Sequence, residues 1–432
     1  MLTMATPNAL AFLVQASVNM TEVWYVGQLG TSSLAAMGFV FPGLMLMQML
    51  SGGAMGGAMA SSIARCLGRG EHETAHQLLW HGVVIAIAAG LVFLTIFYLF
   101  GRQLLETLGA QGIVLAEAMT YGQVIFTAST SIWLASILSG ALRGMGEMRL
   151  PAAIMAGGGL IQVVLSGSLV LGWFGAPKLG VFGAAISVTT IATLSALVAV
   201  AILAKGRLPV RLQLKHFKLR AHLFQDIFSV GALASVSPFF TIASIMVING
   251  LISGYGDAMV AGYGIGARLE FLLVPMIFGF GAAMNTMVGM NVGAGNIDRA
   301  EHIALIGGAS AASITGFVGV FLALFPEVWI GLFTDDPATL AAGVRYLQIS
   351  GWAFAFQGMG LALYFASQGA RKVLWPVLSN VARFVVGAGG AVLVVNVFEA
   401  SIDWVFVCLA LGMVCYGLIT AVSIWLGAWR RA

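Results

Sequence analysis

The sequence predicts an all-α membrane protein in which twelve transmembrane helices form two six-helix bundles, related as a parallel repeat, around a central cavity. Three observations predict this fold. Of the 432 residues, 60% are hydrophobic and only 8% are charged, whereas about 25% of the residues of a soluble domain are charged. Long apolar runs alternate with short polar joints. The same spacing of glycines and a proline in the joints recurs on both sides of the middle of the chain.

Each apolar run is long enough to cross a bilayer as a helix, which takes about 20 apolar residues. The runs are uninterrupted and rich in glycine, and they lack the alternation of a membrane β-barrel, so helices are expected. The twelve runs lie near residues 4–27, 33–63, 78–100, 118–140, 152–174, 181–204, 226–252, 258–290, 303–325, 342–367, 373–397 and 403–427.

Basic residues gather in alternate joints between the runs. If the N-terminus is cytoplasmic, the joints on that side hold 15 of the 20 Lys and Arg residues. This asymmetry follows the positive-inside rule and predicts a multi-pass protein of the bacterial inner membrane with both termini in the cytoplasm. The net charge of +4 therefore reflects topology, and nucleic-acid binding is not indicated.

The longest joint, 205–225, is a basic linker between a predicted N-terminal bundle, 1–204, and a C-terminal bundle, 226–432. Landmarks on its two sides recur in one register, which indicates an internal repeat. The pairs, offset by 225 or 226 residues, are Gly30 with Gly256, Gly68 with Gly293, Gly144 with Gly369, and Pro151 with Pro376. Because each half has an even number of spans, the repeat is parallel, and such halves can rock around a central site.

Two of the sixteen acids, Glu22 and Glu270, fall within an apolar run. A carboxylate there costs several kcal/mol unless it is paired, hydrated or protonated, so each is a candidate functional group. Asn19, three residues before Glu22, shares its helix face and is placed to hydrogen-bond it. The alternative for Glu22 is a carboxylate that reaches outward to the membrane interface.

Glu270 has a basic neighbour, Arg268, two positions away, and residues at that spacing do not face each other on a helix. A packing or gating contact of Glu270 with another helix is therefore as plausible as a transport role. Arg383 stands alone in the run 373–397. It is a candidate partner for either acid or a residue that lines the cavity.

Enzyme chemistry is not indicated, because the chain contains no P-loop, HExxH, GxSxG or GxGxxG motif. His72 and His76 have the i,i+4 spacing of metal ligands, with His81 nearby, but no third ligand is imposed. We expect these histidines to form a solvated helix face. The three cysteines lack metal spacing and are expected to behave as small apolar side chains, so neither a metal nor a cofactor is predicted.

Several phrases resemble the multidrug and toxic compound extrusion (MATE) family, nearest its DinF-like branch. They cover nearly the whole chain in order. The resemblance implies a V-shaped pair of six-helix bundles and drug export driven by an inward flow of protons or sodium. The phrases are Glu22 to Gly30 with Leu34-Ala35-Ala36, Leu142 to Glu147, Tyr255-Gly256-Asp257 to Glu270, and Thr286-Met287-Val288-Gly289 to Arg299-Ala300.

The resemblance places Glu22 where the family has the coupling aspartate of helix 1. The family's helix 5 pattern of Asn, three residues, Asp and Pro falls on Gln162, Ser166 and Gly167, so the second carboxylate is missing. The acid that NorM-like members carry in helix 10 falls on Gln357. Sodium prefers several oxygen ligands, so protons are the expected coupling ion and sodium is the alternative.

We therefore expect a monomeric secondary antiporter that exports small, amphipathic, cationic molecules, with protonation of Glu22 favouring release of the substrate outside. The alternative is a flippase for a lipid-linked oligosaccharide. Its pyrophosphate would require several basic residues facing the cavity, and the sequence offers only Arg268 and Arg383. The other residues expected to support the site or line the cavity are Asn19, Tyr25, Gln162, Ser166, Glu270 and Gln357.

Overall fold

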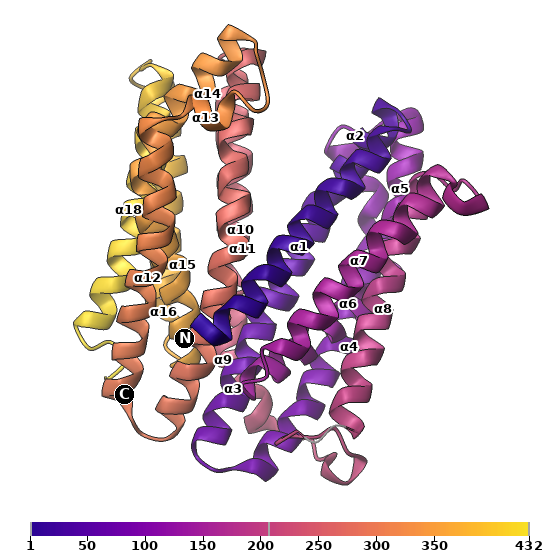
Figure 1. Cartoon of the computed structure of the whole chain (residues 1–432), viewed down its shortest axis with the longest axis vertical. Helices are drawn as coiled ribbons and strands as arrows, with labels where there is room; N and C mark the ends of the chain where they lie inside the picture. The colour runs from indigo at the N-terminus through magenta and orange to yellow at the C-terminus, as the bar shows by residue number, and fades with distance from the viewer. Residues whose placement is uncertain (1, 206–207, 431–432) are drawn as a thin grey trace. The chain divides into compact units, whose positions relative to one another are not determined.

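A computed structural model of the chain describes residues 2–205 and 208–430, and within these ranges the regular structure is helical (Figure 1). Contacts group the chain into two compact units. The N-terminal unit comprises Leu10–Ala232, and the C-terminal unit comprises Met1–Ala9 together with Leu233–Ala432. The predicted division into bundles 1–204 and 226–432 with a linker at 205–225 stays a prediction.

The N-terminal unit is built from the first half of the helices. It contains α1 (Leu2–Gly27, from Leu10 onward), α2 (Thr31–Gln48), η1 (Met49–Met55), α3 (Gly56–Gly68), α4 (His72–Thr107), α5 (Gly112–Thr127), α6 (Ser129–Gly144), α7 (Arg149–Leu171), η2 (Trp173–Gly175), α8 (Val181–Lys205), η3 (Leu214–His216) and most of α9 (Ala221–Ala234).

The C-terminal unit is built from the second half. It contains α10 (Val236–Ser253), α11 (Asp257–Gly293), α12 (Ile297–Leu324), α13 (Glu327–Ile330), α14 (Pro337–Ser350), η4 (Gly351–Ala353), α15 (Phe354–Gly369), α16 (Leu374–Phe384), η5 (Val385–Gly389), α17 (Gly390–Asn396) and α18 (Ile402–Trp425).

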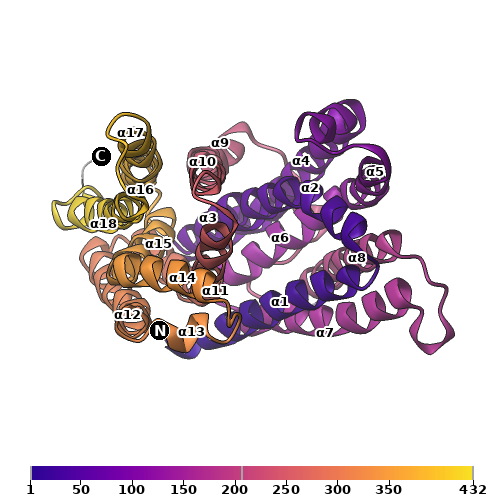
Figure 2. The ribbon, with the colours of Figure 1, turned by 90° about the horizontal axis from the view of Figure 1, so that it is seen from above.

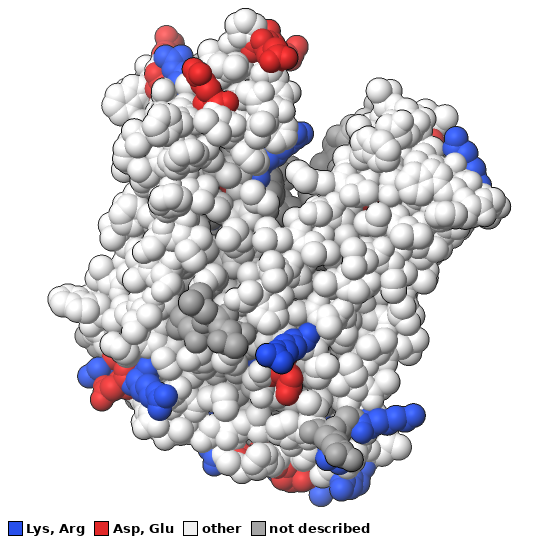
Figure 3. Space-filling view, viewed as in Figure 1, with Lys and Arg blue, Asp and Glu red and all other residues white. Residues whose placement is uncertain are grey.

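The prediction of an all-helical, multi-span membrane protein is confirmed. Among the described residues, ten helical stretches are long and apolar enough to cross a membrane, and the α5 and α6 pair, bent by 47°, makes an eleventh. The twelfth predicted run is α1, which is 26 residues long. It is more polar than the others because it carries Gln15, Asn19 and Glu22. On the face drawn in Figure 3, most charged side chains gather toward the helix ends.

Each unit is organised around one central helix. In the N-terminal unit, α6 packs against α3, α4 and α8 (Figure 2). In the C-terminal unit, α15 packs against α11, α12 and α18. These are the elements that correspond under the offset of 225 residues, so the repeat seen in the sequence is also a repeat of helix packing.

Close helix crossings recur at the same offset. A Cβ atom built on Gly144 of α6 would lie 2.5 Å from the backbone oxygen of Ala60 in α3. A Cβ atom on Gly369 of α15 would lie 2.4 Å from the backbone oxygen of Asn285 in α11. Only glycine lets the backbones approach so closely, as is common where membrane helices cross.

The turns repeat as well. Gly30 and Gly256, which precede α2 and α11, have φ of 123° and 98°, and Gly70 and Gly295 have φ of 77° and 79°. Such positive values favour glycine, which explains why these residues recur in the sequence. Beside Gly70, the Arg69 guanidinium forms a 2.8 Å ion pair that holds the pKa of Glu71 below its ordinary value.

The segment 208–220, which follows α8, lies along α4 and is held there by side chains of that helix. The backbone N–H of Arg211 donates to Nδ1 of His76 at 2.8 Å, and that of Arg220 donates to Nε2 of His81 at 2.9 Å. Trp80 donates its indole N–H to the carbonyl oxygen of Gln213 at 3.0 Å. We call this segment the docked linker.

The expectation of a solvated histidine face is therefore wrong for His81, which is fully buried. The reason is that its ring bridges two backbone groups, with Nδ1 2.8 Å from the oxygen of Gln77 and Nε2 accepting from Arg220. His76 also stacks on His216 of the linker, while His72 is exposed. The described residues contain no group of three side chains arranged to hold a metal ion.

Candidate functional site

Glu22 lies on the buried face of α1. Val18, Tyr25 and Val26 recur on the same face at helical spacing, and each is at most 3% exposed. The carboxyl of Glu22 is itself only 5% exposed. It therefore lies within the helix packing of the N-terminal unit and is not turned outward to the interface.

The helix that faces Glu22 is α7, and a glycine lets it come close. A Cβ atom on Gly159 would lie 3.0 Å from Cγ2 of Val18. One turn further along α7, the Gln162 side-chain amide donates a hydrogen bond of 3.2 Å to Oε2 of Glu22. Gln162 and Ser166, one turn apart on α7, are 6% and 1% exposed, so both lie on the buried side of this helix.

Several oxygens at this contact have unused capacity. Among the described residues, neither Oε1 of Glu22 nor the hydroxyl oxygen of Ser166 has a hydrogen-bond partner, and the same holds for the hydroxyl of Tyr121 on α5. Tyr121 lies close enough to Glu22 to interact with it electrostatically. A buried polar atom without a partner is costly, so this group of oxygens is able to take a proton or a small cation.

Tyr25 and Asn19, the other predicted residues of α1, have different surroundings. The Tyr25 ring is buried and packs edge-on against Trp173 of η2, with 5.2 Å between ring centroids. Asn19 is exposed and accepts a hydrogen bond of 3.3 Å from Gln15. The expected bond between Asn19 and Glu22 is replaced by the one from Gln162, because the α7 side chain reaches the buried face of α1 and Asn19 points away from it.

A second polar group lies in the C-terminal unit around Glu270 of α11. The Tyr346 hydroxyl of α14 donates to Oε1 of Glu270 at 2.7 Å. Glu270 lines a small cavity with Thr315 and Gln357, and Oε1 of Gln357 is buried without a partner among the described residues. Tyr346 is fully buried, and its ring packs edge-on against that of Tyr263, with 5.1 Å between the ring centroids.

The two predicted arginines have different positions. The exposed Arg268 lies over the ring of Phe333, 5.8 Å from its centroid. The half-buried Arg383 lies over the ring of Tyr416 at the same distance and interacts electrostatically with Tyr346 and Tyr263, as Glu270 does. Arg383 therefore belongs to the Glu270 group, and Arg268 is turned toward a different aromatic ring.

Sequence reasoning missed three residues of these groups, namely Tyr121, Tyr263 and Tyr346. Each is an isolated tyrosine in an otherwise ordinary stretch of helix. The pattern of one helix does not show which of its faces meets a carboxyl on another helix, so no local signal could have identified them.

A model of the MatE family matches the chain twice, over residues 7–167 and again over residues 233–393. The chain belongs to the MatE family. The two matches are shifted by 226 residues, within one residue of the offset of every landmark pair in the sequence, so the repeat is confirmed. The protein is a MatE transporter and not an enzyme, as its lack of catalytic motifs predicts. Its placement in the DinF-like branch stays a prediction.

Relatives of this MatE protein align over most of their length. It is 25% identical to a probable multidrug resistance protein, NorM, of Thermotoga maritima, over 87% of this chain and 80% of that protein. It is 24% identical to an FAD transporter of Shewanella oneidensis, over 85% of this chain and 80% of that protein.

Among solved structures, the fold is similar to that of a MOP superfamily transporter from Pyrococcus furiosus, with a TM-score of 0.91 and 21% identity. The similarity covers 99% of this chain and 96% of that one. That transporter is described as having a binding pocket of reverse polarity that suggests a different function. The likeness shows the fold.

Proposed function

We propose that this MatE transporter exports small amphipathic molecules, preferably cations, by antiport with protons that bind to and leave Glu22. The observation that carries the proposal is the burial of Glu22 with, among the described residues, a single hydrogen-bond donor, the neutral amide of Gln162. Burial away from water disfavours a lone carboxylate, so uptake of a proton or of a cationic partner relieves the cost.

The set of oxygens supports protons over sodium. Glu22 is accompanied by the amide of Gln162 and by the hydroxyls of Ser166 and Tyr121, which are all neutral. A sodium site with a single carboxylate would lack the charged oxygen ligands that bind a hard cation strongly. A proton needs one carboxyl oxygen, and Oε1 of Glu22 has no other partner among the described residues.

Coupling follows from competition for one charge. A cationic substrate is stabilised by ionised Glu22, and a proton removes that charge, so each weakens the binding of the other. Lowering the pH should therefore weaken substrate binding. With the linker and both termini in the cytoplasm, as the distribution of basic residues predicts, protons that enter from outside would release the substrate there.

The flippase alternative receives less support. A pyrophosphate-linked lipid calls for several convergent basic groups. Arg268 lies over Phe333 and Arg383 over Tyr416, each engaged with an aromatic ring. Because one relative is named an FAD transporter, an anionic dinucleotide is a useful comparison substrate.

The test is efflux from proteoliposomes that hold the full chain and an imposed pH gradient. We expect wild type to export a fluorescent cation and Glu22→Gln to lose gradient-driven export by about tenfold or more, the size of an ordinary coupling energy. Glu106→Gln is the matched control, because Glu106 is exposed and paired with Arg102. Separate experiments replace the pH gradient with a sodium gradient, or the fluorescent cation with FAD.

Three outcomes would each contradict a part of the proposal. Export by Glu22→Gln at the rate of wild type would remove Glu22 from the coupling, and export driven by sodium but not by protons would replace the coupling ion. Preferred transport of FAD over the cation would overturn the substrate class and leave the role of Glu22 standing.

A further inference from the structure

A groove of about 810 Å³ lies in the N-terminal unit and is formed wholly by its own helices α4, α5, α6 and α8. It lies at the 47° bend between α5 and α6, and Ala128, where the two helices meet, is part of its lining. Neither Glu22 nor any residue of its contact with α7 lines the groove. The groove is thus separate from the candidate coupling site.

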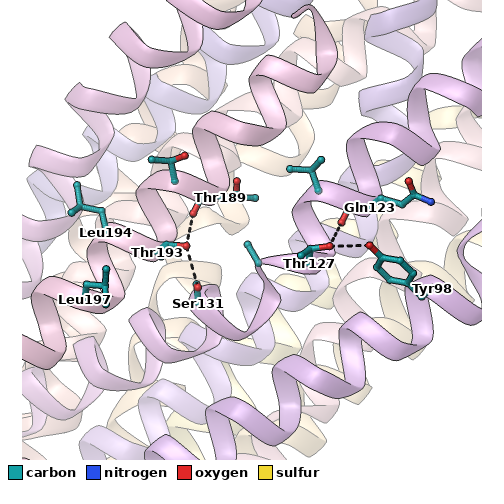
Figure 4. A pocket seen from close by; sticks show the side chains of 11 residues that line it. Tyr98, Gln123, Thr127, Ser131, Thr189, Thr193, Leu194 and Leu197 are labelled. Carbon is teal, nitrogen blue, oxygen red and sulfur yellow. Dashed lines mark hydrogen bonds between the residues drawn. The ribbon is translucent and has the colours of Figure 1, made fainter.

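Hydroxyl groups line both walls (Figure 4). On one wall, the Tyr98 hydroxyl lies 3.1 Å from Oγ1 of Thr127, and either oxygen can donate. On the other wall, Oγ1 of Thr193 and Oγ of Ser131 lie within hydrogen-bonding distance, also at 3.1 Å. The side-chain amide of Gln123 adds further donors and an acceptor beside Tyr98 (Figure 4). We call this the hydroxyl groove.

The lining of the hydroxyl groove also has apolar side chains. Leu194 and Leu197 of α8 are both exposed, and the described lining residues include no Asp, Glu, Lys or Arg. Hydroxyl groups beside such side chains are unusual on a surface that faces lipid, because lipid chains cannot satisfy hydrogen-bonding groups.

The groove is also deep in the predicted membrane. At 1.5 Å per residue, Gln123 lies about 16 Å along α5 from its first residue. Thr189 and Thr193 lie about 12 and 18 Å along α8 from its first residue. The hydrocarbon core is about 30 Å thick, so these groups lie well below the level of lipid phosphates.

The hydroxyls already meet part of their hydrogen-bonding needs. Oγ1 of Thr127 donates to the backbone oxygen of Gln123 at 2.7 Å, and Oγ1 of Thr193 donates to that of Thr189 at 2.8 Å, so Tyr98 donates to Thr127. Each hydroxyl oxygen still has lone-pair capacity, and the exposed side-chain amide of Gln123 carries N–H donors. The patch can therefore both donate to and accept from a guest.

We propose that the hydroxyl groove binds a neutral lipid with a small head group of carbonyl and hydroxyl oxygens, of the chemistry of a diacylglycerol. Three observations select this class. The described lining residues carry no charge to pair with a phosphate, the polar groups lie too deep for a charged head group, and the exposed side chains of Leu194 and Leu197 suit acyl chains. A hydroxyl and two ester carbonyls match the donors and acceptors of the two walls.

The test uses the full chain in phosphatidylcholine vesicles with a trace of photoactivatable diacylglycerol. A parallel sample holds photoactivatable phosphatidylglycerol with the same chains, which differs only in its charged head group. We expect diacylglycerol to label peptides of α5 and α8 about fivefold more than phosphatidylglycerol does, the effect of about one hydrogen bond. Unlabelled diacylglycerol should compete.

The double variant Thr127→Val with Thr193→Val removes both hydroxyls and keeps their shape, so it should lower the diacylglycerol labelling by about fivefold. Thr120→Val is the matched control, because Thr120 is an exposed threonine of α5 outside the groove. Thermal unfolding of each variant shows whether it is folded. Equal labelling by the two lipids, or labelling that the double variant leaves unchanged while folded, would overturn the proposal.

Discussion

Glu22 and Glu270 are the two carboxyls that fall within the apolar runs of the sequence, and their neighbours distinguish them. Glu22 is almost fully buried and accepts a hydrogen bond of 3.2 Å from a neutral amide. Its other oxygen, Oε1, has no hydrogen-bond partner among the described residues. Glu270 is half-buried and accepts a shorter bond, 2.7 Å, from the Tyr346 phenol. A short bond from a fully buried donor fixes a carboxyl in place. The surroundings therefore give Glu270 a structural contact, whatever further role it has.

We predict that Tyr346→Phe lowers the stability of the C-terminal unit by about 1 to 3 kcal/mol, because the half-buried carboxyl of Glu270 loses a strong donor. The measurement is thermal unfolding of the purified protein in detergent. Tyr255→Phe is the matched control, since the exposed Tyr255 donates to a backbone oxygen of Ala400 at 3.2 Å. An unchanged melting temperature for Tyr346→Phe would show that this bond adds nothing to stability.

At the scale of elements, the apolar runs predicted where the helices lie but not where they break. The run 118–140 is divided into α5 and α6 by a 47° bend, and the run 373–397 is divided by η5 into α16 and α17. Packing holds the bend between α5 and α6, where Oγ of Ser129, at the start of α6, lies 2.7 Å from the backbone oxygen of Gly90 in α4.

We predict that Gly369→Ala destabilises the crossing of α11 and α15. The added Cβ would lie 2.4 Å from the backbone oxygen of Asn285, so the two helices must move apart. The expected cost is about 1 to 3 kcal/mol, as for overpacked cores, and thermal unfolding measures it.

Gly157→Ala in α7 is the matched control for this variant, because no atom lies within 4 Å of a Cβ built there. Alanine favours helix at such a position, so we expect unchanged or slightly raised stability. A loss in both variants would show a general effect of replacing glycine. If Gly369→Ala loses no stability, α11 and α15 can move apart at this crossing at little cost in free energy.

At the scale of the whole molecule, one basic segment joins the two repeated halves, and its position is set by α4. The docked linker is held by backbone hydrogen bonds to His76, Trp80 and His81. Nδ1 of His216 in the linker also lies 2.9 Å from Oε1 of Glu73 in α4. The charges of the linker predicted its side of the membrane, but not that it lies against a helix.

We predict that His76→Ala with His81→Ala releases the docked linker. The linker contains Arg211, Lys215, Lys218 and Arg220, at which trypsin cleaves. Loss of its anchors should raise the rate of cleavage by about tenfold or more, because proteolysis follows local opening. His72→Ala is the matched control, since His72 is exposed. Equal cleavage of the double variant and wild type would show that other contacts hold the linker.

The sequence by itself determined the class of fold, the repeat and the carboxyls within the membrane. These features follow from composition, from glycines at turns with positive φ and at close crossings, and from the high cost of charge in lipid, all of which are local properties of the chain. They led to Glu22 and, through the family resemblance, to Gln162 and Ser166 on a second helix.

Tertiary structure alone decided which side chains meet. It paired Glu22 with Gln162 in place of Asn19, brought Tyr121 near Glu22 and Tyr346 onto Glu270, buried His81 beneath the linker, and gathered uncharged hydroxyls of α4, α5, α6 and α8 into one groove. The physical reason is that the sequence does not determine how each helix is rotated about its own axis. A helix that is apolar on nearly every side shows no preferred face in its sequence, so only packing against its neighbours sets the direction in which each polar side chain points.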